Sequence, residues 1–339
     1  MEKIRFFGIT IFGLLAIFTG LLYIGSHIWL WNVISWEPVR IATAALGVLS
    51  VLGYACIRCP RNPAIRSVII TAYVWSAAQF ILSLSYVAWF GLTRFFVIPE
   101  VVPWAVTVGT TLYGYWNAGS ERVRREVVRS QVTDDTRIAV ISDTHLGDVW
   151  GASDLEQIIT RVNRWNPAIT VIAGDLVDGM ETVDEETFEP LEALDSPSYF
   201  ITGNHDGYAD RESVKDAVRS AGVIVLDEAT AVENEVGLIG VGYEEGFPED
   251  TETGTPVSVV VEHEPRRVDV GDVIISGHVH GGQIWPLGWL ARLEFPYVDG
   301  IHEDGEQTYV VSSGARTWGP PLRLGTRSEI VLVDLVPSS

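Results

Sequence analysis

The chain has 339 residues, 47% of them hydrophobic, and a formal net charge of -21. Residues 1–118 hold seven Lys or Arg and three acids, whereas residues 119–339 hold 16 and 41, which indicates a membrane portion followed by a strongly acidic soluble domain. An acidic face repels nucleic acid, so we expect no nucleic-acid partner, and only two cysteines, Cys56 and Cys59, exclude a disulfide framework or a four-cysteine zinc site.

Four apolar segments in the first part of the chain predict a membrane domain over residues 1–118. The first, Phe6 to Ile24, carries no charge and is too long for a removable signal peptide. The others cover residues 41–57, 67–90 and about 95–116, the last interrupted by Pro99 and Pro103. We therefore expect an integral, multi-pass protein of the cell membrane.

The basic residues in the short connections predict the orientation. Nine would share one side of a four-span protein: Lys3, Arg5, Arg58, Arg61, Arg66, Arg122, Arg124, Arg125 and Arg129. Only Arg40 and Arg94 would lie opposite, so both termini and the acidic domain are expected in the cytoplasm. Three or five spans would reverse this assignment.

Residues 119–136 form a basic juxtamembrane segment that we expect to be a linker, helical through Arg129. Its arginines would face the anionic leaflet and hold the domain at a fixed distance, or serve only as the positive-inside signal.

The remaining residues, 137–339, alternate apolar strands with helical patterns and then become rich in strands. Strands are expected over 137–142, 169–173, 199–202 and 223–226, and helices over 154–165, 185–194 and 211–221. From residue 236 onward strands dominate. This pattern predicts parallel strands with helical crossovers, arranged as a four-layer α/β/β/α sandwich of two mixed sheets.

Metal-ligand residue types follow five of the apolar runs directly. They occur as Asp-x-His, Gly-Asp-x-x-Asp, Gly-Asn-His-Asp, a lone His and Gly-His-x-His, at Asp143 and His145, Asp175 and Asp178, Asn204 to Asp206, His263, and His278 and His280. Loops at the ends of strands are where ligands converge in α/β sheets. One such pattern is weak, whereas five in order favour a metal site.

These residue types suit two divalent ions. Imidazoles and carboxylates bind borderline metals, and one carboxylate can bridge two of them. Two ions can activate a water and hold the oxygens of a phosphate during its displacement. The alternative is that Asp and Asn serve as turn residues and the histidines are core groups.

The five motifs resemble those of the calcineurin-like metallophosphoesterases over roughly residues 137–336. The segment SGHVHGGQIWP and the tail SSGARTWGPPLRLGTRSEIVLV resemble the membrane-associated YkuE-like and YaeI-like phosphodiesterase branch. The resemblance implies one metal held by Asp143, His145 and His280, a second held by Asn204, His263 and His278, and Asp175 as the bridge. It implies that His205 contacts the phosphate and protonates the leaving oxygen, that Asp206 orients His205, and that Asp178 supports the ligands from behind.

One departure from this branch lies after His263. The branch has His-x-Pro-Asp, whereas this chain has His263-Glu264-Pro265-Arg266, and only 12 residues separate His263 from Ser276. We expect a shortened helix there and a different wall on the substrate side, with no metal ligand lost.

The resulting hypothesis is a membrane-anchored phosphoesterase with two metal ions, a phosphodiesterase rather than a monoesterase. Mn is the expected metal, with Fe, Zn, Co or Ni as alternatives. A membrane lipid or lipid-linked phosphate is one substrate class, and a soluble nucleotide or cyclic-nucleotide diester is another. The rival hypothesis is a membrane transporter or sensor whose metal-binding domain is regulatory and catalytically silent.

Overall fold

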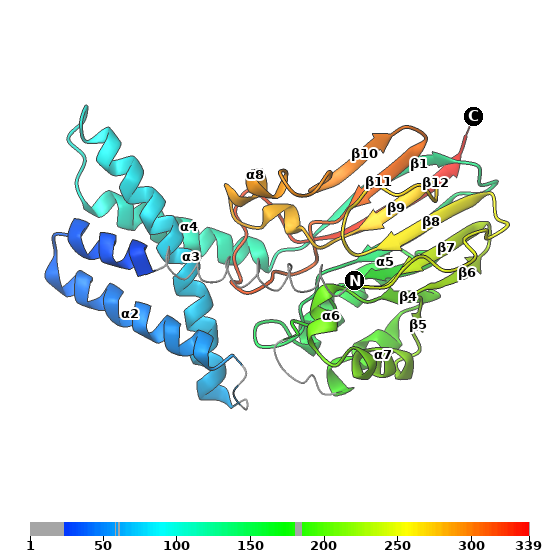
Figure 1. The fold of residues 1–339 in the computed structure, drawn as a ribbon, viewed down its shortest axis with the longest axis horizontal. Helices are drawn as coiled ribbons and strands as arrows, with labels where there is room; N and C mark the ends of the chain where they lie inside the picture. The colour runs from blue at the N-terminus through cyan, green and yellow to red at the C-terminus, as the bar shows by residue number, and fades with distance from the viewer. Residues whose placement is uncertain (1–23, 58, 60–61, 180–184, 339) are drawn as a thin grey trace, which may run out of the picture. The chain divides into compact units, whose positions relative to one another are not determined.

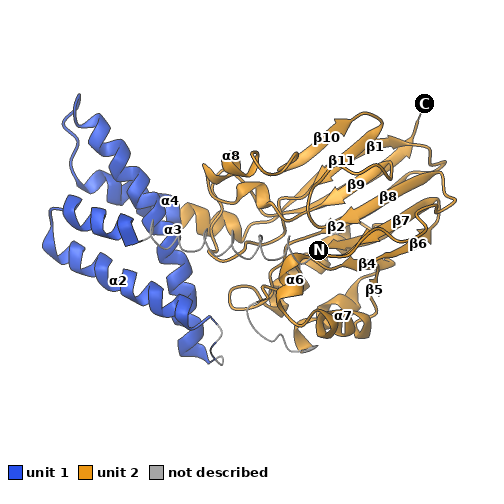
Figure 2. Cartoon of the chain, viewed as in Figure 1, with its two compact units in different colours: residues 1–111 blue, residues 112–339 orange. Residues whose placement is uncertain are grey.

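The computed structural model describes residues 24–57, 59, 62–179 and 185–338 (Figure 1), so the first expected span, Phe6 to Ile24, lies almost entirely outside the described residues. The chain divides into two compact units, residues 1–111 and 112–339. Figure 2 colours them separately, and α4 (Val101–Ala118) contributes to both.

The first unit is helical where it is described. Residues 24–33 are helical, followed by α2 (Glu37–Ala55), α3 (Pro63–Leu92) and the start of α4. The amino end of α3 is fixed by Asn62, whose side chain accepts hydrogen bonds from the amides of Ala64 and Ile65 at 3.0 Å. Among the described helices, α2 and α3 are long and apolar enough to cross a membrane. The count of four spans and the cytoplasmic orientation stay predictions.

The second unit contains two six-stranded mixed sheets among its described residues. The first has the order β1-β12-β2-β3-β4-β5 and the second β10-β11-β9-β8-β7-β6. The first sheet consists of β1 (Arg122–Ser130), β2 (Thr136–Ile141), β3 (Ile169–Ala173), β4 (Ser198–Ile201), β5 (Ile224–Val225) and β12 (Glu329–Pro337). The second consists of β6 (Ala229–Glu233), β7 (Val236–Val241), β8 (Val257–Glu262), β9 (Val273–Ser276), β10 (Gly300–Asp304) and β11 (Gln307–Val311).

The strands from which the site emerges are parallel within each sheet. In the first sheet β2, β3 and β4 are parallel neighbours, and in the second β7, β8 and β9 are. Parallel strands align their carboxyl ends at one edge, so the loops that follow them converge. This alignment brings the five sequence motifs together.

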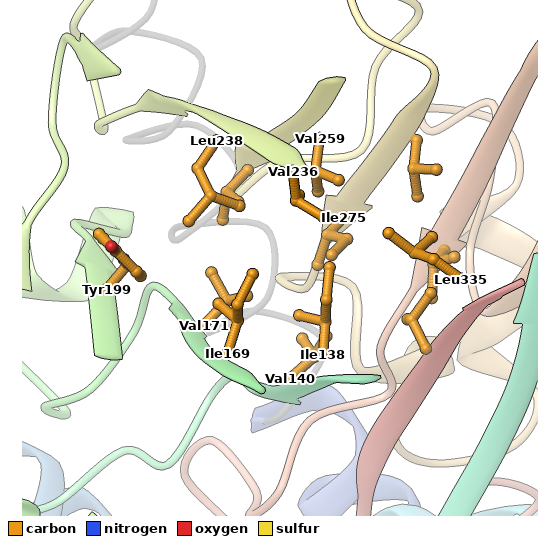
Figure 3. Packing of buried hydrophobic residues seen from close by; sticks show 14 of the residues in the cluster. Ile138, Val140, Ile169, Val171, Tyr199, Val236, Leu238, Val259, Ile275 and Leu335 are labelled. Atoms are coloured by element: carbon orange, nitrogen blue, oxygen red, sulfur yellow. The ribbon is translucent and has the colours of Figure 1, made fainter. Parts of the chain in front are cut away.

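The two sheets face each other across an apolar core. Figure 3 shows Ile138, Val140 and Val171 of the first sheet opposite Val259 and Ile275 of the second. These strands are apolar at nearly every position because both of their faces are buried, as expected of parallel strands.

Helices cover the outer face of the first sheet, where α5 (Ala152–Arg164) and α7 (Arg211–Ser220) pack on a second apolar cluster. Shorter elements are η1 (Glu185–Thr187), η2 (Glu189–Ala193), α6 (Asn204–Tyr208), η3 (His280–Gly282) and α8 (Leu287–Ala291). On the second sheet, Val268 and Tyr297 from loops cover the outer face. The predicted class, a helical region followed by an α/β sandwich of two mixed sheets, is confirmed, although loop residues build this outer covering.

The expectation of a helical linker is wrong. Residues 122–130 form β1, which pairs in parallel with β12 and is part of the first sheet. Arg122 and Arg124 each pair with buried Glu329 at 3.1 and 3.2 Å, and Arg125 pairs with Asp334. These arginines therefore have acidic partners within the domain. The division of the chain at residues 118 and 136 stays a prediction.

Candidate metal centre

Three groups of ligand-type side chains lie together where the strands end. They are Asp143, His145 and His280; His145, Asp175 and His205; and Asp175, His263 and His278. Within each group the potential ligand atoms lie within 4.8 Å of one another. The first and third groups coincide with the two expected metal sites, apart from Asn204, and Asp175 adjoins both.

The backbone at this site adopts conformations that side chains rarely accept. Asp143, His145, Asp175, His278 and His280 have positive φ angles of 53°, 45°, 53°, 70° and 54°. A residue other than glycine avoids this region, and residues held there concentrate at functional sites. With this backbone conformation, the ligand side chains of different loops lie close together.

Backbone hydrogen bonds join the loops to each other. The amide of Asp143 donates to the Gly174 carbonyl at 3.0 Å, and the amide of His145 donates to the Asp175 carbonyl at 3.1 Å. The amide of His278 donates to the Asp143 carboxylate at 3.0 Å. The first two bonds join loops of the first sheet, and the third joins a loop of the second sheet to them. Together they hold the ligand-bearing loops of both sheets in place.

Glycine is required where these loops cross. A Cβ built on Gly203 would collide with the amide and the carboxylate of Asp175, and one on Gly277 would collide with the carboxylate of Asp143. Both collisions are with groups of the site itself. The glycines preceding Asn204 and His278 thus allow the loops to approach closely.

Several buried polar atoms fit a metal. Among the described residues, Asn204 Oδ1 is buried and lacks a hydrogen-bond partner, and His263 Nε2 is buried with Asp175 Oδ2 3.0 Å away. The Nδ1 of His263 lies 2.8 Å from the Ala173 carbonyl oxygen, which can only accept a hydrogen bond, so Nδ1 carries a hydrogen. The lone pair of Nε2 could then coordinate a metal. Unpartnered buried groups are costly, and a divalent ion would satisfy them.

Burial sets the charge of the other histidines. It lowers the pKa of His278 to about 3 and the pKa values of His145 and His280 well below their usual range. These imidazoles are therefore neutral, which is the form that binds metals.

Asp175 and His263 form a coupled pair. Burial opposes both charges, but Asp175 Oδ2 lies 3.0 Å from His263 Nε2, and this attraction raises the pKa of His263 to about 10. Similarly, burial would raise the pKa of Asp175, but the nearby histidines, His263 foremost, hold it well below its usual range.

Two hydrogen bonds position His205. Its amide donates to Asp175 Oδ1 at 2.8 Å, and its Nδ1 donates to the Asp178 carbonyl at 2.6 Å, which leaves Nε2 for another partner. Its ring packs against Tyr208 and Trp318 at centroid distances of 5.2 and 5.6 Å.

The structure gives Asp206 partners other than the His205 side chain, and its expected role of orienting His205 stays a prediction. Asp206 accepts hydrogen bonds from the amides of Asp175 at 2.9 Å, Gly203 at 2.8 Å and Val177 at 3.1 Å. It therefore holds the turn that carries Asp175. Burial, followed by the charge of Asp175, raises the pKa of Asp206 to about 7. Asp178 Oδ1 lies 3.8 Å from His145 Nδ1, and its supporting role also stays a prediction.

Sequence reasoning missed two buried arginines in the segment between β11 and β12. Arg323 is fully buried and donates to the His280 carbonyl at 3.0 Å, with a second nitrogen 3.2 Å from His280 Nδ1. Arg316 pairs with Glu121 and lies over the Trp150 ring at 5.0 Å. The signal was present in the sequence as two arginines in an apolar, glycine-rich and proline-rich tail.

The comparisons with known proteins agree with this geometry. The family model described as calcineurin-like phosphoesterase matches residues 136–282. An uncharacterized metallophosphoesterase of Aquifex aeolicus is 31% identical over 222 residues, which cover 59% of this chain and 85% of that protein. The chain belongs to the calcineurin-like phosphoesterase family. Members are metallophosphoesterases, hydrolases that use divalent metals.

Two further relatives of this chain show how far the match extends. The "transmembrane protein with metallophosphoesterase domain" of Danio rerio is 34% identical over 232 residues, covering 59% of this chain and 53% of that protein. YkuE of Bacillus subtilis, an uncharacterized metallophosphoesterase, is 26% identical over 230 residues, covering 60% and 79%. The chain thus spans about half the length of the Danio rerio relative, and its assignment to the YkuE-like and YaeI-like branch stays a prediction.

Proposed function

We propose that this protein is a membrane-anchored phosphodiesterase that uses two divalent metal ions. The observation that carries the proposal is the pair of ligand groups that adjoin Asp175, with His205 beside them. In this proposal Asp143, His145 and His280 hold one ion, Asn204, His263 and His278 hold the other, and Asp175 bridges them. Two such ions, when bound, activate a water and stabilise charge on the phosphate.

His205 is proposed to protonate the leaving oxygen. Its Nδ1 is committed to the Asp178 carbonyl, so only Nε2 can carry a proton to the substrate. The hydrogen bond from its backbone amide to Asp175 Oδ1 keeps the ring beside the carboxylate that is proposed to bridge the ions. A proton delivered to the departing oxygen assists the departure of a poor leaving group.

Aromatic rings beside the site favour a diester. Tyr208 and Trp318 pack against His205, and Phe295 packs against His278 with ring centroids 5.2 Å apart. Such rings suit a phosphate with a second, apolar substituent better than a free phosphate monoester. We propose Mn as the metal, a lipid or lipid-linked diester as the substrate class, and the cytoplasmic leaflet as the location.

The test compares two chromogenic substrates on the full chain in detergent, stripped of metal and then loaded with Mn. We expect kcat/KM for bis(4-nitrophenyl) phosphate to exceed that for 4-nitrophenyl phosphate by at least about tenfold, and chelation to abolish both activities. Faster hydrolysis of the monoester would contradict the diester assignment. No hydrolysis of either substrate by the metal-loaded protein would favour the catalytically silent transporter or sensor.

A further inference from the structure

A short segment beside the metal centre exposes large apolar side chains. This apolar lobe, residues 284–293, contains α8, a helix with no buried residue. Five of its large side chains are between 40 and 84% exposed: Trp285, Leu287, Trp289, Leu290 and Leu293. Soluble proteins rarely expose so many large apolar groups together, and such patches mark interaction sites.

The charge of the lobe differs from that of the domain around it. Residues 283–293 contain no acid and one base, Arg292, although residues 119–339 hold 41 acids and 16 bases. Tryptophan, leucine and a single arginine suit the boundary between lipid headgroups and acyl chains. Two copies of this chain, each with a net charge of -21, would repel each other, which favours lipid over a second copy as the occupant.

The lobe is joined to the end of α4 through two consecutive residues, Arg323 and Leu324. The Trp285 amide donates to the Leu324 carbonyl at 2.8 Å, and the Arg323 amide donates to the Gly114 carbonyl in α4 at 3.0 Å. The lobe and the last turns of α4 lie at the same end of the two sheets (Figure 2). These turns also carry exposed apolar residues, Leu112, Tyr113, Tyr115 and Trp116. Both the helix end and the lobe thus expose apolar side chains.

The residues on either side of the lobe connect it to the metal centre. Immediately before it, the Gln283 side chain donates to the Trp318 carbonyl at 2.9 Å and accepts from the Trp318 amide at 3.1 Å, and the Trp318 ring packs on His205. Just after it, Phe295 packs on His278. A molecule held at the lobe would therefore lie next to the site.

We infer that the apolar lobe inserts into the headgroup region of the bilayer and presents the metal centre to phosphodiesters at the membrane surface. This rests on the proposed function for the identity of the substrate. The insertion itself is independent of catalysis.

The test places a fluorescent label on the lobe of the full chain. In a background with Cys56→Ser and Cys59→Ser, Leu290→Cys is labelled with a nitrobenzoxadiazole maleimide and reconstituted in nanodiscs of phosphatidylcholine and phosphatidylglycerol. The matched control is Val232→Cys, since Val232 in β6 is also an exposed apolar residue, at 53%. Trp289→Cys serves as a second lobe variant, and unchanged thermal unfolding midpoints verify folding.

We expect the lobe label to be quenched by nitroxide lipids and protected from aqueous iodide, whereas the control label shows the reverse. Iodide quenching of the lobe label equal to that of the control would overturn the inference. Protection from both quenchers would also overturn it, because a second copy would then cover the lobe. Failure of the proposed function would appear separately, as lipid quenching without turnover of a soluble diester.

Discussion

Arg323→Met is expected to destabilise the catalytic unit by loosening the loop that carries His280. The Arg323 guanidinium donates to the carbonyls of His280 at 3.0 Å and Arg316 at 2.6 Å, and also to that of Ser313. Each buried carbonyl left without a donor costs ~1–3 kcal/mol, so the low end for three gives a loss of about 3 kcal/mol. Methionine fills similar space without a charge, so part of the desolvation cost of the buried arginine is relieved.

For a unit of this size, about 3 kcal/mol lowers Tm by roughly 6–12 °C. The assay is thermal unfolding of the full chain by circular dichroism, with metal content measured by elemental analysis. Arg323→Lys should show a smaller loss, since an ammonium keeps the charge but reaches fewer carbonyls. The matched control is Arg267→Met, which removes an exposed arginine paired with Asp304 at 2.8 Å and should change Tm little. A shift for Arg323→Met no larger than that of the control would refute the reasoning.

Three further predictions concern the site and the topology. His205→Ala should keep both metals and slow turnover by on the order of 10² to 10⁴, less for a nitrophenyl diester than for an alkyl diester, because nitrophenolate needs little protonation. Steady-state kinetics on the two substrates checks this, and equal losses would leave phosphate positioning as its role. Asp175→Asn should abolish turnover and lower the metal content measured by elemental analysis, since the bridging charge serves both ions; unchanged occupancy would remove the bridging role. A phosphatase reporter fused at the carboxyl terminus should be inactive and a fluorescent one bright, and the reverse result would place the domain outside.

The sheets and the convergence of the motifs could be predicted because apolar strands and the residues after them are local features. Asp143, Asp175 and His263 each follow a run of buried residues, and parallel strands align such ends. The strand boundaries from β2 to β4 agree with those expected to within one residue.

β1 could not be predicted from local pattern. Its sequence, RVRREVVRS, is rich in arginine, and its place in the sheet comes from pairing with β12, about two hundred residues later. Glu329 pairs with Arg122 and Arg124, and Asp334 pairs with Arg125, and the sequence of residues 122–130 does not reveal these partners. Tertiary pairing overrides the local polar composition here.

The roles of Asp206 and Arg323 also depend on distant contacts. The family resemblance implied that Asp206 orients His205, whereas the α6 turn points the carboxylate at the amides of Asp175 and Val177. Arg323 reaches His280 across 43 positions of sequence. Only the fold shows which carbonyls and amides a buried charged group satisfies.

Metal stoichiometry and turnover measured on one sample test the central claim most directly. Metal-stripped full-length protein is titrated with Mn, and bound metal and hydrolysis of bis(4-nitrophenyl) phosphate are measured at each step. Because Asp175 is proposed to bridge both ions, turnover should appear as the second equivalent binds. Full turnover at one bound ion, or two bound ions with no turnover, would contradict the account.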